Sequence, residues 1–98
     1  MRLLIQVHRA ARAEFIAAAS RYEAERPGLG VEFIAEIDRC ISLAAEQPKA
    51  YAVVHDDTRR VTSRGFPFSV YFRLEAPHIV VLAVFHGRRN PSIWQRRA

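Results

Sequence analysis

The break "RPGLG" at Arg26–Gly30 constrains the fold of this chain most, because an amphipathic helical pattern precedes it and another follows it. Pro27 disfavours helical geometry at Arg26, and Gly28 permits a left-handed turn. The linker is so short that the two helices must lie side by side and antiparallel. The sequence therefore predicts a helical hairpin.

The two predicted helices extend over about Arg9–Glu25 and Val31–Gln47. Apolar residues recur at every third or fourth position in each, as expected for helices that bury one face. These residues are Ala11, Phe15, Ala18, Ala19 and Tyr22 in the first helix, and Val31, Ile34, Ile37, Ile41 and Ala44 in the second, with Phe33 and Cys40 alongside. Since the chain has one cysteine, Cys40, we expect a buried thiol and no internal disulfide.

Strand-like patterns lie on both sides of the hairpin. A short alternating stretch, Leu3–His8, precedes it, and three strands are predicted after a connector at Pro48–Thr58: Arg60–Arg64, Phe68–Glu75 and Ile79–Phe85. The second of these alternates between apolar and polar residues, which is typical of a strand with one buried face. The third is apolar on both faces, as in a central strand. The first is polar, which favours an edge position.

The expected fold is α+β with the element order β-α-α-β-β-β. An antiparallel sheet, with the short N-terminal strand added to it, packs against the helical hairpin. A chain of 98 residues corresponds to one domain, 1–98, and it ends in a short tail. The helices cover one sheet face, and we expect the other face to bind another chain. The side chains expected on that face are Tyr71, Arg73, Val80, Leu82 and Val84.

Positive charge is concentrated in the second half of the chain. Residues 59–98 contain eight arginines and one glutamate, a net charge of +7, whereas residues 1–58 contain seven bases and nine acids, a net charge of −2. This asymmetry indicates a polyanionic partner, either nucleic acid or an acidic protein segment. We expect the arginines to gather along one exposed rim. The alternative is a solvated arginine-rich surface without a partner.

Other features of the sequence exclude several classes of protein. The longest apolar run, Ile79–Phe85, is far shorter than the roughly 20 residues of a membrane-spanning helix. The chain starts directly with a strand-like run, so we expect no secretion signal, a cytoplasmic location and no membrane partner. His8, His55 and His78 lie apart, and no cysteine accompanies them, so we expect no metal site and no cofactor.

The element order and four stretches of sequence resemble the ParE/RelE toxin superfamily, and its ParE-like branch most. The stretches are the short first strand, "YEAERPGLGVEFIAEID", "RRVTSRGFPFSVYFR" and "IVVLAVFHGRRNPSIW". The resemblance covers nearly the whole chain. It implies a bacterial, plasmid-stabilising toxin of a type II toxin–antitoxin system. Its partner would be an acidic, ParD-like antitoxin with a ribbon-helix-helix N-terminus, which binds the toxin directly and alone contacts operator DNA.

The resemblance is compatible with three cellular roles. ParE-like relatives poison DNA gyrase, and this is the role we expect. RelE-like relatives cut messenger RNA on the ribosome, and a third possibility is a regulatory member that binds its partner without being toxic. We therefore expect no enzymatic activity, and any activity would be that of a metal-independent endoribonuclease.

A ribonuclease of this kind needs groups that transfer protons and cations that stabilise the phosphorane charge. His86 has a suitable pKa for the first task. Arg64, Arg73 and Arg88 supply cations for the second. A second proton-transfer group is missing near the C-terminus, because no tyrosine follows Tyr71 and the only lysine lies in the connector.

Two further sets of residues are candidates for binding. We expect the antitoxin to contact Arg59, Arg60, Arg64, Tyr71 and Arg73. We expect the target to contact His86, Arg88, Arg89 and Trp94, because they follow the end of a central strand, where functional residues tend to occur. The structural alternatives are a backbone-bonded His86, a Trp94 that anchors the tail by packing, and a charged edge that prevents strand pairing between molecules.

Overall fold

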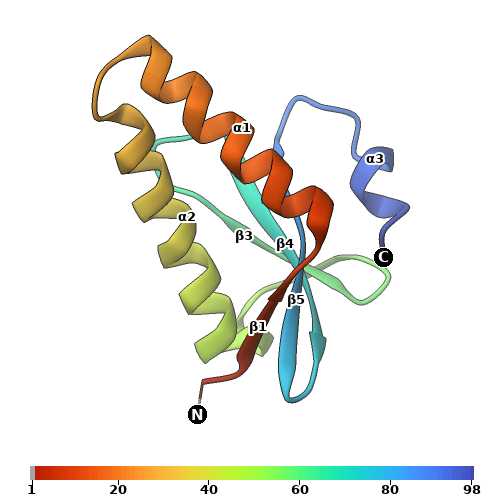
Figure 1. Ribbon diagram of the computed structural model, residues 1–98. Coiled ribbons are helices and arrows are strands. Elements are labelled where there is room, and N and C mark those ends of the chain that lie inside the picture. The colour runs from red at the N-terminus through yellow and green to blue at the C-terminus, as the bar shows by residue number, and fades with distance from the viewer. Residues whose placement is uncertain (1) are drawn as a thin grey trace.

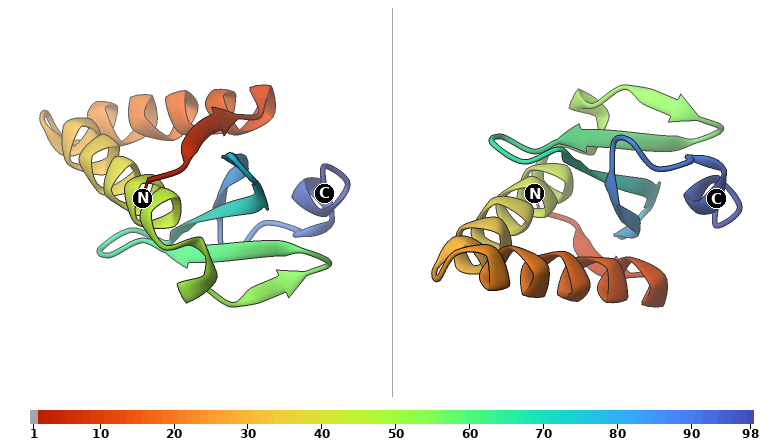
Figure 2. Two further views of the ribbon diagram at one scale, coloured as in Figure 1. Left: turned by 90° about the horizontal axis from the view of Figure 1, so that it is seen from below. Right: turned by 90° about the horizontal axis from the view of Figure 1, so that it is seen from above.

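The computed structural model describes residues 2–98, so Met1 of the expected domain lies outside the described part. One mixed sheet has the strand order β1-β5-β4-β3-β2, and helices α1 and α2 cover one of its faces (Figures 1 and 2). The elements are β1 (Leu4–Val7), α1 (Arg9–Glu25), α2 (Leu29–Glu46), a 3-10 turn (Pro48–Ala50), β2 (Val53–His55), β3 (Thr58–Thr62), β4 (Phe68–Glu75), β5 (His78–His86) and α3 (Ser92–Gln95). The predicted α+β fold, with a helical hairpin on the sheet, is confirmed.

The sheet combines one parallel pair of strands with three antiparallel pairs. Strand β1 runs parallel to β5, with Leu4 opposite His78 and Val7 opposite Val81. A parallel pair needs a long crossover connection, and the helical hairpin provides it. The other three pairs are antiparallel, as expected.

The prediction for the strand Arg60–Arg64 is wrong in its bounds and in its place at the edge of the sheet. Its counterpart, β3, begins and ends two residues earlier and lies inside the sheet, between β4 and β2. The short strand β2, within the segment expected to be a connector, forms the edge instead. A strand of three residues is too short to show an alternating pattern in the sequence, so β2 could not be recognised there.

The connection between the two long helices depends on glycine at two positions. Gly28 has a φ angle of +92°, in the left-handed region that the sequence predicts. The Glu23 carboxylate accepts hydrogen bonds from the backbone N–H groups of Gly28 and Gly30, at 2.9 and 3.0 Å. A Cβ atom on Gly30 would lie only 2.6 Å from the carbonyl oxygen of Ala19, so this glycine lets α2 cross close to α1.

The helix face that packs on the sheet is rotated from the predicted one. Phe33 and Ile37 are buried as expected, but Val31 and Ile34 are 66% and 41% exposed. Successive residues of a helix are about 100° apart. Because Gly30 and Phe33 face the core, Val31 and Ile34 point away from it. The prediction that both belong to the buried stripe is therefore wrong.

Aromatic rings pack closely between the hairpin and the turn that joins β3 to β4. Centroid distances between neighbouring rings are 5.0 to 6.1 Å, and the arrangements are edge-on or tilted. These rings belong to Phe15, Tyr22, Phe33, Phe66 and Phe68. Such edge-on contacts stabilise a pair by about 0.5–1.5 kcal/mol beyond the burial of its area.

The side chains of strand β5 exchange sheet faces partway along the strand. Its register with β4 passes from Val81 opposite Phe72 to Ala83 opposite Tyr71, so Leu82 is an extra residue in a β-bulge. A bulge of this kind inverts the alternation of side chains beyond it. Val84 therefore packs in the core under the helices, whereas Ala83 belongs to a smaller cluster apart from that core. The prediction that places Val84 on the open face is wrong for this reason.

The close helix crossing gives a first prediction. In Gly30→Ala the added methyl group meets a backbone oxygen that cannot rotate away, so the helices must separate. The clash should cost about 1–3 kcal/mol and alanine gains roughly 1 kcal/mol in helix propensity, so we expect a net loss of up to about 2 kcal/mol in the free energy of unfolding. Urea unfolding followed by circular dichroism measures this loss.

The matched control is Gly87→Ala, because a Cβ atom there has Pro67 oxygen at an ordinary contact distance of 3.7 Å. Its unfolding midpoint should match that of the wild type. Equal midpoints for Gly30→Ala and the wild type would contradict the close crossing.

Candidate functional site

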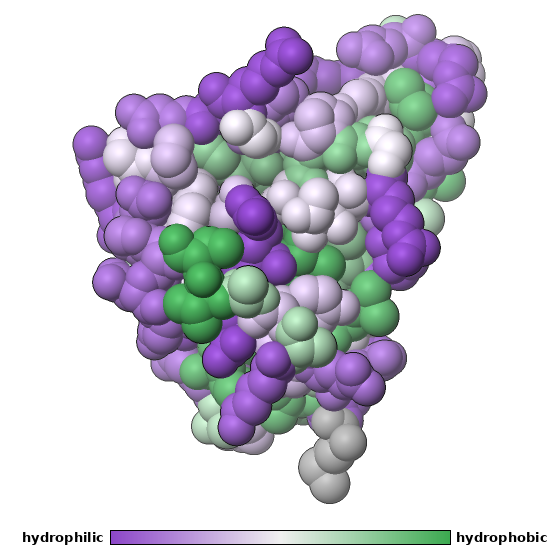
Figure 3. Space-filling view, turned by 180° about the vertical axis from the view of Figure 1, so that it is seen from behind, coloured by the Kyte–Doolittle hydropathy of each residue, from purple (hydrophilic) through white to green (hydrophobic). Residues whose placement is uncertain are grey.

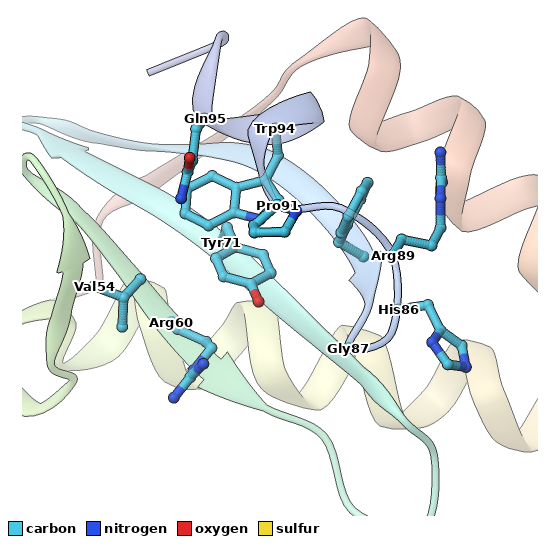
Figure 4. A pocket seen from close by; sticks show the side chains of 10 residues that line it. Val54, Arg60, Tyr71, His86, Gly87, Arg89, Pro91, Trp94 and Gln95 are labelled. Carbon is cyan, nitrogen blue, oxygen red and sulfur yellow. The ribbon is translucent and has the colours of Figure 1, made fainter.

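The sheet face opposite α1 and α2 contains a cavity of about 260 Å³. Figure 3 shows this face, on which hydrophilic side chains surround smaller hydrophobic groups, and Figure 4 shows the cavity from close by. The cavity is lined by residues from strands β2, β3 and β4, from the end of β5, and from the segment that follows β5. They are Val54, Arg60, Tyr71, Phe85, His86, Gly87, Arg89, Pro91, Trp94 and Gln95.

Helix α3 forms one wall of the cavity through Trp94. The Trp94 ring stacks on Tyr71, with a centroid distance of 4.2 Å and an angle of 24° between the planes. The two side chains are 3% and 7% exposed, and with Ala83 and Phe85 they form a small second core. This placement corresponds to the packing anchor named above as the alternative for Trp94.

A largely buried ion pair attaches the last residues of the chain to the rest of the molecule. The Arg97 guanidinium donates two hydrogen bonds to the Glu14 carboxylate, at 3.0 and 2.9 Å, and both side chains are 13% exposed. Arg97 also donates to the carbonyl oxygen of Leu82, and Glu14 accepts from the backbone N–H of Val84. Because β1 ends at Val7, these side chains satisfy the part of β5 that lacks a strand neighbour on that side.

Two arginines of the cavity have no acidic partner among residues 2–98. Arg60, on β3, lies opposite Tyr71 in the sheet register. The Arg89 guanidinium lies over the Phe85 ring, 4.6 Å from its centroid, in a cation–π contact. In Figure 4 the Tyr71 hydroxyl points away from Trp94, toward the side of the cavity where Arg60 lies. The Tyr71 hydroxyl and Arg60 therefore share one side of the cavity, whereas Arg89 lies at the opposite side in Figure 4.

His86 lies at the border of the cavity, where β5 ends. Its Nδ1 atom accepts a hydrogen bond of 3.0 Å from the backbone N–H of Arg88, which is the backbone-bonded state considered as an alternative. With Arg89 it also lines a second cavity of about 240 Å³ on the side of α1, next to Glu14 and Arg21. Arg88 is exposed on the loop that follows.

The structure does not bring the predicted ribonuclease residues together. His86 pairs with Phe68 in the register, and Arg73 lies five residues further along β4, a separation of roughly 17 Å at 3.3 Å per residue. Arg73 also forms an ion pair with Glu75. Arg64 lies in the turn after β3. Arg73 is therefore too far along β4 to act on the same phosphate as His86.

The residues predicted for antitoxin binding do not all lie in one place either. Arg60 and Tyr71 reach the cavity, whereas Arg73 lies further along the sheet. Arg59 donates a hydrogen bond of 2.7 Å to the carbonyl oxygen of Tyr51. The structure therefore separates Arg59 and Arg73 from the predicted antitoxin residues that line the cavity. Instead the cavity brings Arg60 and Tyr71 together with three residues predicted for target contact, His86, Arg89 and Trp94. The role of Val54 was missed because β2 was not recognised.

Glu36 holds the turn that carries Arg64. Its carboxylate accepts two hydrogen bonds from Arg39, at 2.9 and 2.7 Å, and one of 2.6 Å from the backbone N–H of Arg64. The Arg39 hydrogen bonds are the main reason why the pKa of Glu36 is lowered to about 2. The Cys40 thiol also donates to Glu36, and burial raises the pKa of Cys40 to about 11. The thiol is thus buried, as predicted.

Residues 2–98 contain no group of three His, Cys, Asp or Glu side chains that could hold a metal ion. No helix in the same part of the chain has the length and apolar character needed to cross a membrane.

Comparison with known proteins defines the class to which this fold belongs. The fold is similar to that of a solved chain described as "Chromosomal ParDE TA system from P. aeruginosa", with a TM-score of 0.76 and 19% identity. The match covers 87% of this chain and 96% of the other. Among curated proteins the sequence has no match. Residues 5–91 match the family described as "ParE toxin of type II toxin-antitoxin system, parDE", so the chain belongs to the ParE toxin family.

The environment of Glu36 gives a second prediction. Because its folded-state pKa is about 2, below the ordinary 4.5, the carboxylate stabilises the protein fully above pH 4.5 and progressively less as the pH falls to about 2. In Glu36→Gln we expect a loss of about 1.5–3 kcal/mol at pH 7. This loss should shrink between pH 4.5 and the lowest pH at which the protein stays folded, and urea unfolding across a pH series measures it.

Glu32→Gln is the matched control, because that carboxylate forms only an exposed ion pair with Arg26. Its effect should stay below about 1 kcal/mol at every pH. A loss in Glu36→Gln that does not depend on pH would refute the assignment.

Proposed function

We propose that this chain is a toxin that arrests bacterial growth by poisoning DNA gyrase and that a cognate antitoxin neutralises by direct binding. The observation that carries the proposal is the match to the ParE toxin family over residues 5–91. Its site of action is the cytoplasm, where gyrase is found. The antitoxin is acidic and ParD-like, with a ribbon-helix-helix N-terminus, and only through it does the toxin reach operator DNA.

The charge distribution supports an acidic antitoxin. Residues 59–98 carry a net charge of +7, and two arginines of the sheet-face cavity lack an acidic partner within the described chain. An acidic segment that also bears apolar groups can pair with these cations and cover the exposed Val53 and Val54 of β2. Electrostatic complementarity of this kind speeds association and excludes partners of the wrong charge.

The geometry favours a gyrase poison over a ribosomal endonuclease. Cleavage of RNA requires the proton-transfer group and the phosphate-binding cations within reach of one phosphate. Arg73 lies at the opposite end of β4 from the strand pair that contains His86, and it is already bonded to Glu75. The separation of these residues weighs against the endonuclease.

The gyrase proposal predicts a specific response to induction without antitoxin. Growth should stop, the DNA-damage response should rise, and transcripts should stay intact, as measured by a damage-reporter fusion and by mapping of RNA ends. Co-expression of the neighbouring gene should restore growth. Transcript cleavage would identify an endonuclease instead, and normal growth at verified soluble expression would leave only a regulatory role.

Antitoxin binding is tested by reversing charge on the sheet face. In the variant Arg60→Glu with Arg64→Glu, repulsion replaces attraction, so we expect the dissociation constant of the purified complex to rise more than ten-fold. Binding by the wild type should also weaken with salt. Lys49→Glu, in the exposed 3-10 turn, is the control and should bind as the wild type does. An unchanged affinity in the double variant would place the interface elsewhere.

A further inference from the structure

We infer that the second cavity of about 240 Å³, between α1, the start of β4 and the end of β5, is a phosphate-binding site. We call it the helix-side cavity. The residues of its wall that matter here are Ala13, Ala17 and Arg21 of α1, together with Phe68, His86 and Arg89. The inference goes beyond the proposed function. It combines cations that lack acidic partners, a histidine that donates a hydrogen bond, and space left by small side chains.

Two arginines from different parts of the chain supply the charge of the helix-side cavity. Arg21 lies in the last two turns of α1, and Arg89 lies in the loop after β5. Neither forms an ion pair within residues 2–98. In Figure 4 the Arg89 side chain extends toward α1 and away from Arg60, and His86 lies on the same side. The face of the Arg89 guanidinium lies over Phe85, so the N–H donors along the edge of its plane are available to an anion.

The one acid that lines the helix-side cavity, Glu14, is already neutralised. Its Oε1 atom accepts hydrogen bonds from the backbone N–H of Val84 and from Arg97, and its Oε2 atom accepts another from Arg97. The ion pair adds no net charge to the cavity. An incoming anion therefore meets the two arginines without repulsion from a free carboxylate.

His86 adds an N–H donor that comes from the end of β5. Its Nδ1 atom accepts a hydrogen bond of 3.0 Å from the backbone N–H of Arg88. A ring nitrogen that accepts a hydrogen bond carries no proton, so the proton of the neutral ring lies on Nε2. The His86 ring also packs edge-on against Phe68, with the two centroids 5.3 Å apart, and this contact holds its orientation.

Small side chains on α1 leave room for the anion. Ala13 and Ala17 precede Arg21 at intervals of four residues, so all three lie along the same face of the helix. Each alanine presents only a methyl group toward the cavity. A longer side chain at either position would fill the space between α1 and Val84 of β5.

The arrangement of the donors suits a phosphate group better than a carboxylate. The donors come from three places around the cavity, which are α1, the end of β5 and the loop that follows. One guanidinium can satisfy both oxygens of a carboxylate, whereas a phosphate group has further oxygens for the other donors. Nothing in the cavity stacks on a base, because Phe68 is 5% exposed. Recognition should therefore be independent of nucleotide sequence, as phosphate contacts are.

The test measures binding of small anions to the purified chain by ¹H–¹⁵N NMR at constant ionic strength. The probes are inorganic phosphate, thymidine 5′-monophosphate, the dinucleotide thymidylyl-thymidine, and the dicarboxylate glutarate. We expect the phosphate probes to shift the backbone signals of Ala13, Ala17 and His86 in a saturable manner, with an affinity at least five-fold above that of glutarate. Tightest binding of the dinucleotide would assign the site to a nucleic-acid strand. Tightest binding of either of the other two phosphates would assign it to a small phosphate compound.

Variants separate the cavity from general attraction between charges. Arg21→Gln and Arg89→Gln should each weaken phosphate binding at least five-fold. Arg12→Gln removes the same charge from an exposed position of α1 outside the cavity and should leave the affinity within two-fold of the wild type. Ala17→Leu keeps every charge but fills the cavity, so it should abolish binding. Its control is Ala24→Leu, at an exposed position of the same helix, and the same spectra report whether each variant is folded.

Three results would overturn the inference: equal affinity for phosphate and glutarate, equal weakening by all three arginine variants, or undiminished phosphate binding by folded Ala17→Leu. None of these measurements depends on toxicity. Growth arrest together with a failed anion experiment would remove the phosphate site and leave the proposed function in place. Specific phosphate binding without growth arrest would keep the site and remove the toxin proposal.

Discussion

The Glu14 carboxylate is the group on which the arrangement of the sheet-face cavity depends. It lies on α1, accepts a hydrogen bond from β5 and binds Arg97 near the end of the chain. Burying an ion pair costs desolvation energy, and only good geometry with further hydrogen bonds offsets it. Here Leu82 and Val84 supply those bonds. Without this pair, the packing of Trp94 against Tyr71, Phe85 and His55 would be the main contact that holds α3 over the sheet.

Local sequence patterns were sufficient to predict the elements that build the scaffold. The bounds of α1 and the alternation in β4 follow from periods of three to four or of two residues, and the left-handed Gly28 follows from the Pro-Gly break. The rotation of α2 was not predictable in this way, because Val31 fits the apolar stripe as well as Phe33 does. Their difference arises from the contact of Gly30 with α1, which involves residues distant in sequence.

The candidate site was less predictable than the fold for the same physical reason. The residue types were recognised, but their grouping depends on which face of a strand each occupies. Arg59 and Arg60 are adjacent in sequence, and yet one bonds to Tyr51 while the other lines the cavity. The bulge at Leu82 leaves no local pattern, since every residue around it is apolar. Ion pairs such as Arg97 with Glu14 join residues too far apart for any local pattern to indicate.

The bulge at Leu82 gives the molecule two hydrophobic clusters of unequal size that meet along β5. The larger lies under α1 and α2, and the smaller consists of Tyr71, Ala83, Phe85 and Trp94. Native proteins open in separate cooperative units, and the units with the fewest buried contacts open first. Release of α3 breaks up only the smaller cluster and leaves the larger one intact. We therefore expect the α3 wall of the cavity to open at a lower free-energy cost than the core under α1 and α2.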